Sequence, residues 1–281
     1  MLRSSLTPTH GRLLVAAAAV LWSMGGPFAK LVELPGPTMA CLRALFAGLV
    51  LLPLVRPRAV RFRPAMIGLV ACFAAMNACY VTSITLTTAA NAIFLQYTAP
   101  AWMFLASVLW LGEPVDRRNL LSLGVGMIGI AVIVVGDWRE ASLGIVLALV
   151  AGVTYGGVAV FLRVLRDEDA VWLTVLNHLI GGAVLLPVLF VRDEWQPVGI
   201  SAASWAAMAI FGAVQMGIPY ILFSRGLSVI TPQEAGIIAL VEPVLNPVLT
   251  YFAVGEQPSP TTIGGGGVIL SAVVLRYGFL K

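Results

Sequence analysis

Glu242 is an acidic residue about ten positions into a long apolar segment of the chain. An acid at mid-membrane depth costs roughly 2.5–3.5 kcal/mol on insertion scales, so its side chain must face a partner or a polar cavity. Asn246 follows one helical turn later on the same face. Pro243 and Pro247 weaken the backbone hydrogen bonds around it. This pattern predicts a polar centre inside an apolar helix, able to bind a substrate amine or a coupling proton.

Arg43 is the natural electrostatic partner of this acid, since it is the one charge inside a second apolar segment. Two hypotheses remain open. A buried salt bridge between Arg43 and Glu242 would make both residues structural. Alternatively, Glu242 serves a substrate or a proton while Arg43 supplies the opposite charge. Glu234 differs from both, because it lies at the start of its helix, where the helix dipole favours a solvated acid.

Further polar and aromatic residues lie well inside apolar segments. Any one of them alone would more often serve a helix–helix hydrogen bond than a ligand. Together they predict a polar, aromatic-lined cavity that binds a small-molecule substrate. Besides Arg43, Glu242 and Asn246, the candidates are Trp22, Asn77, Tyr80, Gln96, Tyr97, Tyr155, His178, Gln215 and Tyr220.

The sequence lacks the signatures of an enzyme or a metal site. It has no Gly-Lys-Ser/Thr phosphate loop and no HExxH motif, and its only histidines are His10 and His178. Cys41, Cys72 and Cys79 fall inside apolar segments without clustered histidines, which favours a packing role. We therefore expect no catalytic residue, no cofactor and no bound metal.

The composition indicates the class of protein that must position these residues. The 281 residues are 59% hydrophobic and 11% charged, with a mean hydropathy of +0.96. Soluble domains carry about 25% charged residues, so this composition predicts an all-α membrane protein in a lipid bilayer. A helix needs about 20 apolar residues to cross the bilayer. The sequence accordingly predicts ten transmembrane helices, at 13–33, 37–55, 65–87, 89–111, 119–136, 142–163, 170–191, 202–225, 232–254 and 260–279.

The second half of the chain repeats the first. Residues 88–113 align without a gap on residues 231–256, and offsets of 133 and 134 align the earlier segments. Chance similarity among Leu-, Ala- and Gly-rich segments is the alternative, but three blocks in the same order favour a repeat. Two repeats of five helices, at 1–140 and 141–281, would enter the membrane from opposite sides, as in secondary transporters. The matched pairs include Trp22/Tyr155, Lys30/Arg163, Thr88/Thr231, Pro100/Pro243, Gly112/Gly255 and Glu113/Glu256.

The basic residues predict the orientation, because Lys and Arg gather in cytoplasmic loops. With both termini cytoplasmic, the outer ends hold only Lys30, Arg139 and Arg192. This distribution accounts for the net charge of +4 without a nucleic-acid partner. A signal peptide is the other interpretation of residues 1–30, but this segment has a repeat partner. The inner ends hold 13 of the 17 Lys and Arg residues: Arg3, Arg12, Arg56, Arg58, Arg61, Arg63, Arg117, Arg118, Arg163, Arg166, Arg225, Arg276 and Lys281.

These features together resemble the EamA-type permeases of the drug/metabolite transporter superfamily. The resemblance covers almost the whole chain and rests on the order and spacing of short motifs. It implies a ten-helix transporter of the bacterial cytoplasmic (inner) membrane, with a central cavity formed largely by helices 1, 3, 4, 6, 8 and 9. The motifs are Leu21-Trp22-Ser23, Ser83-Ile84, Thr87-Thr88-Ala89-Ala90, Pro100, Gly112-Glu113, Gly226-Leu227, Thr231-Pro232, Glu242-Pro243 and Gly255-Glu256.

The expected function is a secondary transporter, more specifically an exporter, of a small metabolite such as an amino acid or a related amphipathic compound. Alternating access would carry the substrate through the central cavity, with protons as a candidate coupling ion. A passive channel or facilitator is the first alternative, and an intramembrane enzyme or a scaffold is the second. The pattern fixes neither the substrate, nor the direction, nor the oligomeric state.

Overall fold

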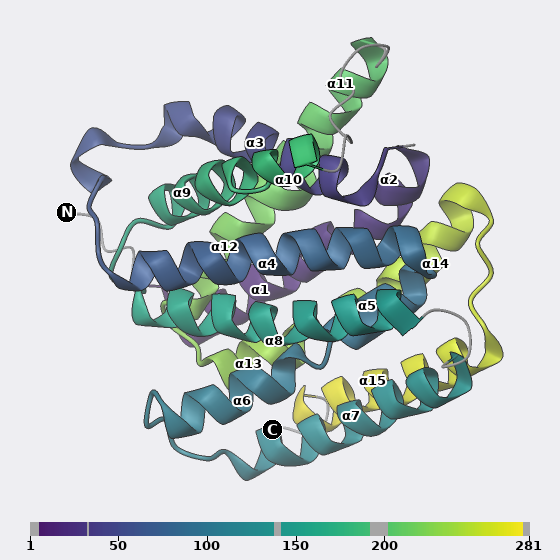
Figure 1. The fold of residues 1–281 in the computed structure, drawn as a ribbon. Coiled ribbons are helices and arrows are strands. Elements are labelled where there is room, and N and C mark those ends of the chain that lie inside the picture. The colour runs from purple at the N-terminus through teal and green to yellow at the C-terminus, as the bar shows by residue number, and fades with distance from the viewer. Residues whose placement is uncertain (1–5, 33, 138–141, 192–201, 278–281) are drawn as a thin grey trace.

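The computed structural model of the chain describes residues 6–32, 34–137, 142–191 and 202–277. Every regular element in these ranges is helical (Figure 1), as an all-α membrane fold requires. Short 3₁₀ turns at Leu52–Leu54 and Pro57–Ala59 and a π-helical segment at Phe211–Gly217 (η3) complete the elements. The α-helices are α1 Pro8–Trp22, α2 Gly25–Leu31, α3 Gly36–Leu51, α4 Ala65–Leu86, α5 Ala89–Gln96, α6 Ala99–Leu109, α7 Arg117–Asp137, α8 Ser142–Val164, α9 Ala170–Ala183, α10 Leu186–Val191, α11 Ala202–Ile210, α12 Ile218–Leu227, α13 Pro232–Ala239, α14 Glu242–Val254 and α15 Pro260–Tyr277.

Nine helical segments in the described ranges are long and apolar enough to cross a membrane, and they overlap the first nine predicted spans. The tenth predicted span coincides with α15, in which Ile263–Ala272 forms a shorter apolar stretch. The count of ten therefore stays a prediction. Arg3, Arg139, Arg192 and Lys281, which entered the orientation argument, lie outside the described residues.

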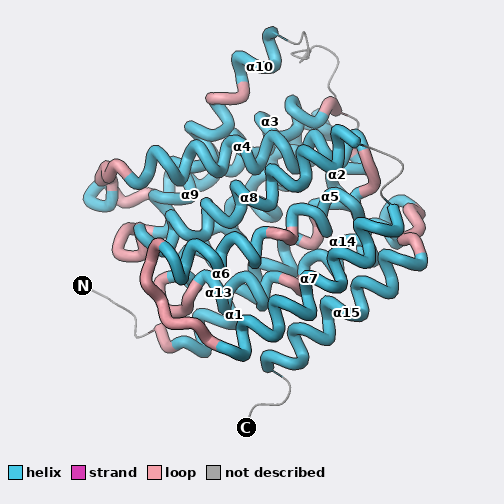
Figure 2. Tube along the Cα trace, turned by 60° about the horizontal axis from the view of Figure 1, so that its bottom comes forward, coloured by secondary structure: helices cyan, strands magenta, loops and turns pink. Residues whose placement is uncertain are grey.

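The helices form layers that run in roughly one direction across Figure 1. α4 packs along α8, α3 along α9, and α1 along α12 and α13. α7 and α15 form a further pair, which Figure 2 shows side by side at one edge of the molecule. The central helices are therefore covered on several sides, which allows polar side chains to lie away from lipid.

Several of the spans are broken rather than continuous, which corrects the uninterrupted helices expected from sequence. The breaks fall at Ser23–Met24, Tyr97–Thr98, Val184–Leu185 and Leu240–Val241. Each break lies just before a proline, which lacks an N–H group and whose ring collides with the carbonyl four residues earlier. The π-helical segment η3 likewise ends just before a proline. The prolines are Pro27, Pro100, Pro187, Pro243 and, after η3, Pro219.

The helices of the fourth and ninth spans share their local construction at positions 143 residues apart. Thr88 and Thr231 each cap a helix, accepting hydrogen bonds from the backbone N–H groups of Asn91 and Glu234. Both spans break nine to ten residues later, and both are followed by a glycine with positive φ, 64° at Gly112 and 73° at Gly255. A positive φ suits glycine because it has no Cβ atom.

The contact between α7 and α15 allows a test of the packing. A Cβ atom added to Gly129 would lie 2.7 Å from the backbone oxygen of Gly265, so the two helices approach backbone to backbone. We expect Gly129→Ala to lower the free energy of unfolding by about 1–3 kcal/mol through overpacking. Gly124→Ala, on the same helix, is the matched control, because nothing lies within 4 Å of its added Cβ. Equal melting temperatures of the two variants in detergent would contradict the close approach.

Candidate substrate-binding cavity

A buried cavity of about 30 Å³ lies within the helical bundle. Its walls come from α1, α3, α4, α5, α8, η3, α12 and α14, and each lining residue is at most 6% exposed. The lining side chains therefore lie away from the surface of the bundle. The lining residues are Trp22, Arg43, Met76, Tyr80, Gln96, Tyr155, Gln215, Met216, Tyr220 and Glu242.

Glu242 lies where two broken spans meet. It is the first residue of α14, where the free backbone N–H groups of the helix favour a negative charge. The hydroxyl of Tyr97 donates a hydrogen bond to Glu242 Oε2. Tyr97 itself lies at the break between α5 and α6. The two interrupted helices thus place one acidic group at the cavity wall and its hydrogen-bond donor, which does not line the cavity, beside it.

Arg43 carries the positive charge of the cavity and is held by Asn77. Both Nε and Nη2 of Arg43 donate to Asn77 Oδ1, at 3.1 and 2.7 Å, and Asn77 Nδ2 donates to the carbonyl of Ala40 at 2.8 Å. The guanidinium carbon lies 5.5 Å from the centroid of the Phe211 ring, within cation–π range. Nη1 of Arg43 is buried and has no hydrogen-bond partner. Asn77 therefore fixes the orientation of the Arg43 guanidinium group and leaves the N–H donors of Nη1 available for a ligand.

The two charges do not neutralise one another. Within the described ranges, no salt bridge joins Arg43 to Glu242, although both line the same cavity. The structural hypothesis of a buried Arg43–Glu242 salt bridge is thus wrong for this conformation. A buried charge without an ion-pair partner is costly, which is a common mark of a functional position.

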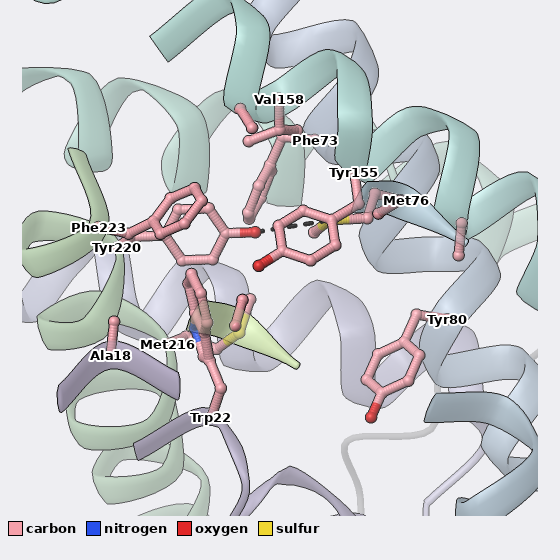
Figure 3. Packing of buried hydrophobic residues seen from close by; sticks show 14 of the residues in the cluster. Ala18, Trp22, Phe73, Met76, Tyr80, Tyr155, Val158, Met216, Tyr220 and Phe223 are labelled. Carbon is pink, nitrogen blue, oxygen red and sulfur yellow. Dashed lines mark hydrogen bonds between the residues drawn. The ribbon is translucent and has the colours of Figure 1, made fainter. Parts of the chain in front are cut away.

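Aromatic residues also line the cavity, and Figure 3 shows the packing of several of their rings. Trp22 contacts Tyr155 edge to face, with ring centroids 6.0 Å apart, and contacts Tyr220 at 5.1 Å. The two residues that the sequence repeat relates, Trp22 and Tyr155, thus meet at one cavity instead of facing lipid. The hydroxyl groups of Tyr80 and Tyr155 are buried without a partner, so both can serve a ligand.

Gln96 and Gln215 also line the cavity, whereas four predicted residues do not: Asn77, Tyr97, His178 and Asn246. Gln215 Nε2 donates to the carbonyl of Trp22 at 3.1 Å, which stabilises the break after α1, and its Oε1 has no partner. His178 bonds to the Thr174 carbonyl and packs against Tyr220, so it supports an aromatic wall.

Asn246 also lies outside the cavity lining. It is fully buried beside α2, and its amide oxygen would lie 2.3 Å from a Cβ atom added to Gly26. Neither its amide oxygen nor its amide nitrogen has a hydrogen-bond partner. Asn246 is buried, as its helical spacing from Glu242 predicts. On this face of α14, however, Glu242 lines the cavity, whereas Asn246 packs against α2.

Met76 and Met216 line the cavity but were not predicted from the sequence. Nothing distinguishes a cavity methionine from a packing methionine in a chain that is 59% hydrophobic. Glu234, predicted to be a solvated acid at the start of its helix, is instead buried. It is 8% exposed, and Arg12 Nε donates to its Oε1 at 2.7 Å.

A bundle of helices long enough to span a membrane, around a buried cavity with charged and aromatic side chains, is typical of membrane transport proteins. The sequence profile of the EamA-like transporter family matches this chain twice, at residues 9–135 and 142–278. The chain belongs to this family.

Relatives across the full length agree with this assignment. An uncharacterized transporter of Archaeoglobus fulgidus is 30% identical over 269 residues, covering 95% of this chain and 96% of the relative. The pseudopaline exporter CntI of Pseudomonas aeruginosa is 23% identical, with 94% of each chain covered. The uncharacterized transporter YvbV of Bacillus subtilis is also 23% identical, covering 96% of this chain and 92% of the relative.

A crystal structure of a protein that is 16% identical has the same fold, with a TM-score of 0.79 over 98% of this chain and 99% of that one. The chain is therefore an integral membrane protein and a transporter, not an enzyme. Its substrate is a small molecule, and its bacterial relatives favour the bacterial inner membrane.

Proposed function

We propose that this protein is a secondary transporter that exports a small zwitterionic metabolite, such as an amino acid or a related amphipathic compound, by alternating access. The observation that carries the proposal is a buried cavity lined by a basic and an acidic side chain that form no ion pair with each other. Arg43 would bind a substrate carboxylate, and Glu242 would bind its ammonium group. A zwitterion satisfies both charges at once and adds no net charge to the interior.

The aromatic residues favour a substrate with an apolar part as well. Trp22, Tyr155 and Tyr220 provide ring edges and faces beside Glu242, where an ammonium group gains a cation–π contact worth about 0.5–2 kcal/mol. The free hydroxyl groups of Tyr80 and Tyr155 add hydrogen bonds. This combination suits an amphipathic molecule better than an inorganic ion.

A thermal-shift panel tests this substrate class. Amino acids should raise the melting temperature of the detergent-solubilised protein, because a ligand that binds only the folded state stabilises it. Matched amines without a carboxylate and acids without an amine are the controls, and each should give a much smaller shift. If the amines raised the melting temperature as much as the amino acids, Arg43 would have no role in binding the substrate. If the acids did so, Glu242 would have none.

An outward direction is supported by one relative, since CntI is named as a pseudopaline exporter. The buried position of all its lining residues favours alternating access over the rival channel function, because a channel needs a continuous open path. Glu242 is also the group that we propose for a coupling proton, since a carboxyl group can exchange a proton for a substrate amine.

The proposed architecture is ten helices in two inverted five-helix repeats, at 1–140 and 141–281. The matching caps, breaks and positive-φ glycines 143 residues apart support it, as do the two family matches. Two successive repeats that each contain an odd number of membrane-spanning helices must have opposite orientations in the membrane. Such inverted repeats are the usual basis of alternating access.

The membrane topology can be tested with reporter fusions. Reporter fusions after Arg58 and Arg117 should be cytoplasmic, and a fusion after Asp137 should be external, because basic residues are retained on the inner side. Alkaline phosphatase and green fluorescent protein fusions measure this directly. The opposite pattern, or an external C-terminus, would refute the proposed orientation.

A further inference from the structure

Two ion pairs lie at opposite ends of the bundle, one on each side of the cavity. Lys30 Nζ, near the end of α2, lies 3.1 Å from Glu256 Oε2, just after α14. Arg163 Nε, near the end of α8, lies 3.0 Å from Glu113 Oε1, just after α6. In Figure 1, α2 and α14 lie at the right, whereas α6 extends to the lower left. We call these ends the α2 end and the α8 end.

Each ion pair occupies the same position relative to the cavity. Lys30 follows the cavity residue Trp22 by eight residues. Arg163 likewise follows Tyr155 by eight, which is about 12 Å along the continuous helix α8. Lys30 and Arg163 are aligned by the sequence repeat. Their acidic partners, Glu256 and Glu113, are aligned by it as well. Each pair therefore joins a basic residue of one half to an acidic residue of the other.

Additional hydrogen bonds tie each pair to a further helix. Glu256 Oε1 accepts from the backbone N–H of Ala89, the first residue of α5, at 3.1 Å. Arg163 Nη1 donates to the carbonyl of Leu227, the last residue of α12, at 2.9 Å. The four charged side chains are only 13–28% exposed, so water screens the ion pairs incompletely.

From this geometry we infer that Lys30–Glu256 and Arg163–Glu113 are two gates that open in alternation. This inference rests on the proposed transport function. In this structure both pairs are formed, and the residues that line the cavity are buried. Opening one end separates helices of the two halves there and breaks its ion pair, while the other pair keeps the opposite end closed. Loss of one pair shifts the population towards the conformation that is open at that end.

Side-specific labelling of a cavity cysteine tests the gates without a substrate. Met216→Cys places a thiol on the cavity wall in a background in which Cys41, Cys72 and Cys79 are alanine. A membrane-impermeant maleimide is added to vesicles of either orientation. We expect Glu256→Gln to accelerate labelling from the α2 end roughly fivefold, the shift that loss of a partly screened ion pair allows. Glu113→Gln should do the same from the α8 end only.

Two controls separate gating from general loosening. The charge-swapped pair Lys30→Glu with Glu256→Lys should restore slow labelling. Arg63→Gln, which removes the Arg63–Glu168 ion pair, should leave both rates unchanged. Unchanged rates in both gate variants, or acceleration from both faces in either one, would overturn the inference. Because labelling requires no transport, these outcomes are distinct from a failure to bind zwitterions in the thermal-shift panel.

Discussion

Glu242→Gln is expected to abolish transport of the zwitterionic substrate while the protein stays folded. Glutamine keeps the shape of the side chain and can still accept the hydrogen bond of Tyr97, but it removes the negative charge that faces the cavity. Loss of one partner of a buried charge pair costs about 2–5 kcal/mol, so binding should weaken by a factor of roughly 30 or more. Radiolabelled amino-acid uptake into proteoliposomes and monodispersity in detergent are the two measurements.

Tyr97→Phe is the matched control for this variant. It removes the hydroxyl donor but keeps the carboxylate, so the loss should be near 0.5–1.5 kcal/mol. If Glu242→Gln instead transports normally at every pH and only melts several degrees earlier, the residue is structural and the proposed role is wrong.

Arg43→Met should produce a loss of comparable size that depends on the carboxylate of the ligand. Methionine fills a similar volume in an apolar wall but provides no donor, whereas the native Nη1 is free for an anion. An amino acid should therefore bind about 2–5 kcal/mol more weakly to the variant. The corresponding amine, which has no carboxylate, should bind the variant and the wild type with similar affinity. Isothermal titration with both ligands measures the difference.

Asn77→Leu provides a second arm of this test, because Asn77 directs the guanidinium group without lining the cavity. It should weaken binding of the amino acid and spare binding of the amine, as Arg43→Met does. Equal losses for both ligands in either variant would show that the substitutions disturb the cavity generally, and would refute a carboxylate site.

The cavity can be predicted from the sequence because polar and charged side chains are costly in the membrane interior. Glu242, Arg43 and Gln215 are expensive in lipid, so each was expected to face a polar space, and each lines the cavity. Aromatic residues such as Trp22 could be included because the repeat aligns Trp22 with Tyr155. The position of Asn246 could not be predicted in the same way. Helical spacing identifies the buried face of its helix, but not whether that face contacts the cavity or a neighbouring helix.

Some of the helix breaks can be predicted from the positions of the prolines alone. Pro27 and Pro100 each remove an N–H donor in the middle of a long apolar segment, which is enough to expect a break just before them. The pairing of Arg43 with Asn77, in contrast, depends on how α3 packs against α4. No periodicity within either helix reports that contact, and the same holds for the ion pair of Arg163 with Glu113.

Counterflow in proteoliposomes tests the central claim most directly. Vesicles that contain the protein are loaded with an unlabelled amino acid selected by the thermal-shift panel, and the labelled form is added outside. Alternating access predicts saturable entry of label that is accelerated by the internal amino acid and is lost in Glu242→Gln. A flux that rises linearly with concentration, without acceleration by the internal amino acid, would contradict a transporter and indicate a channel.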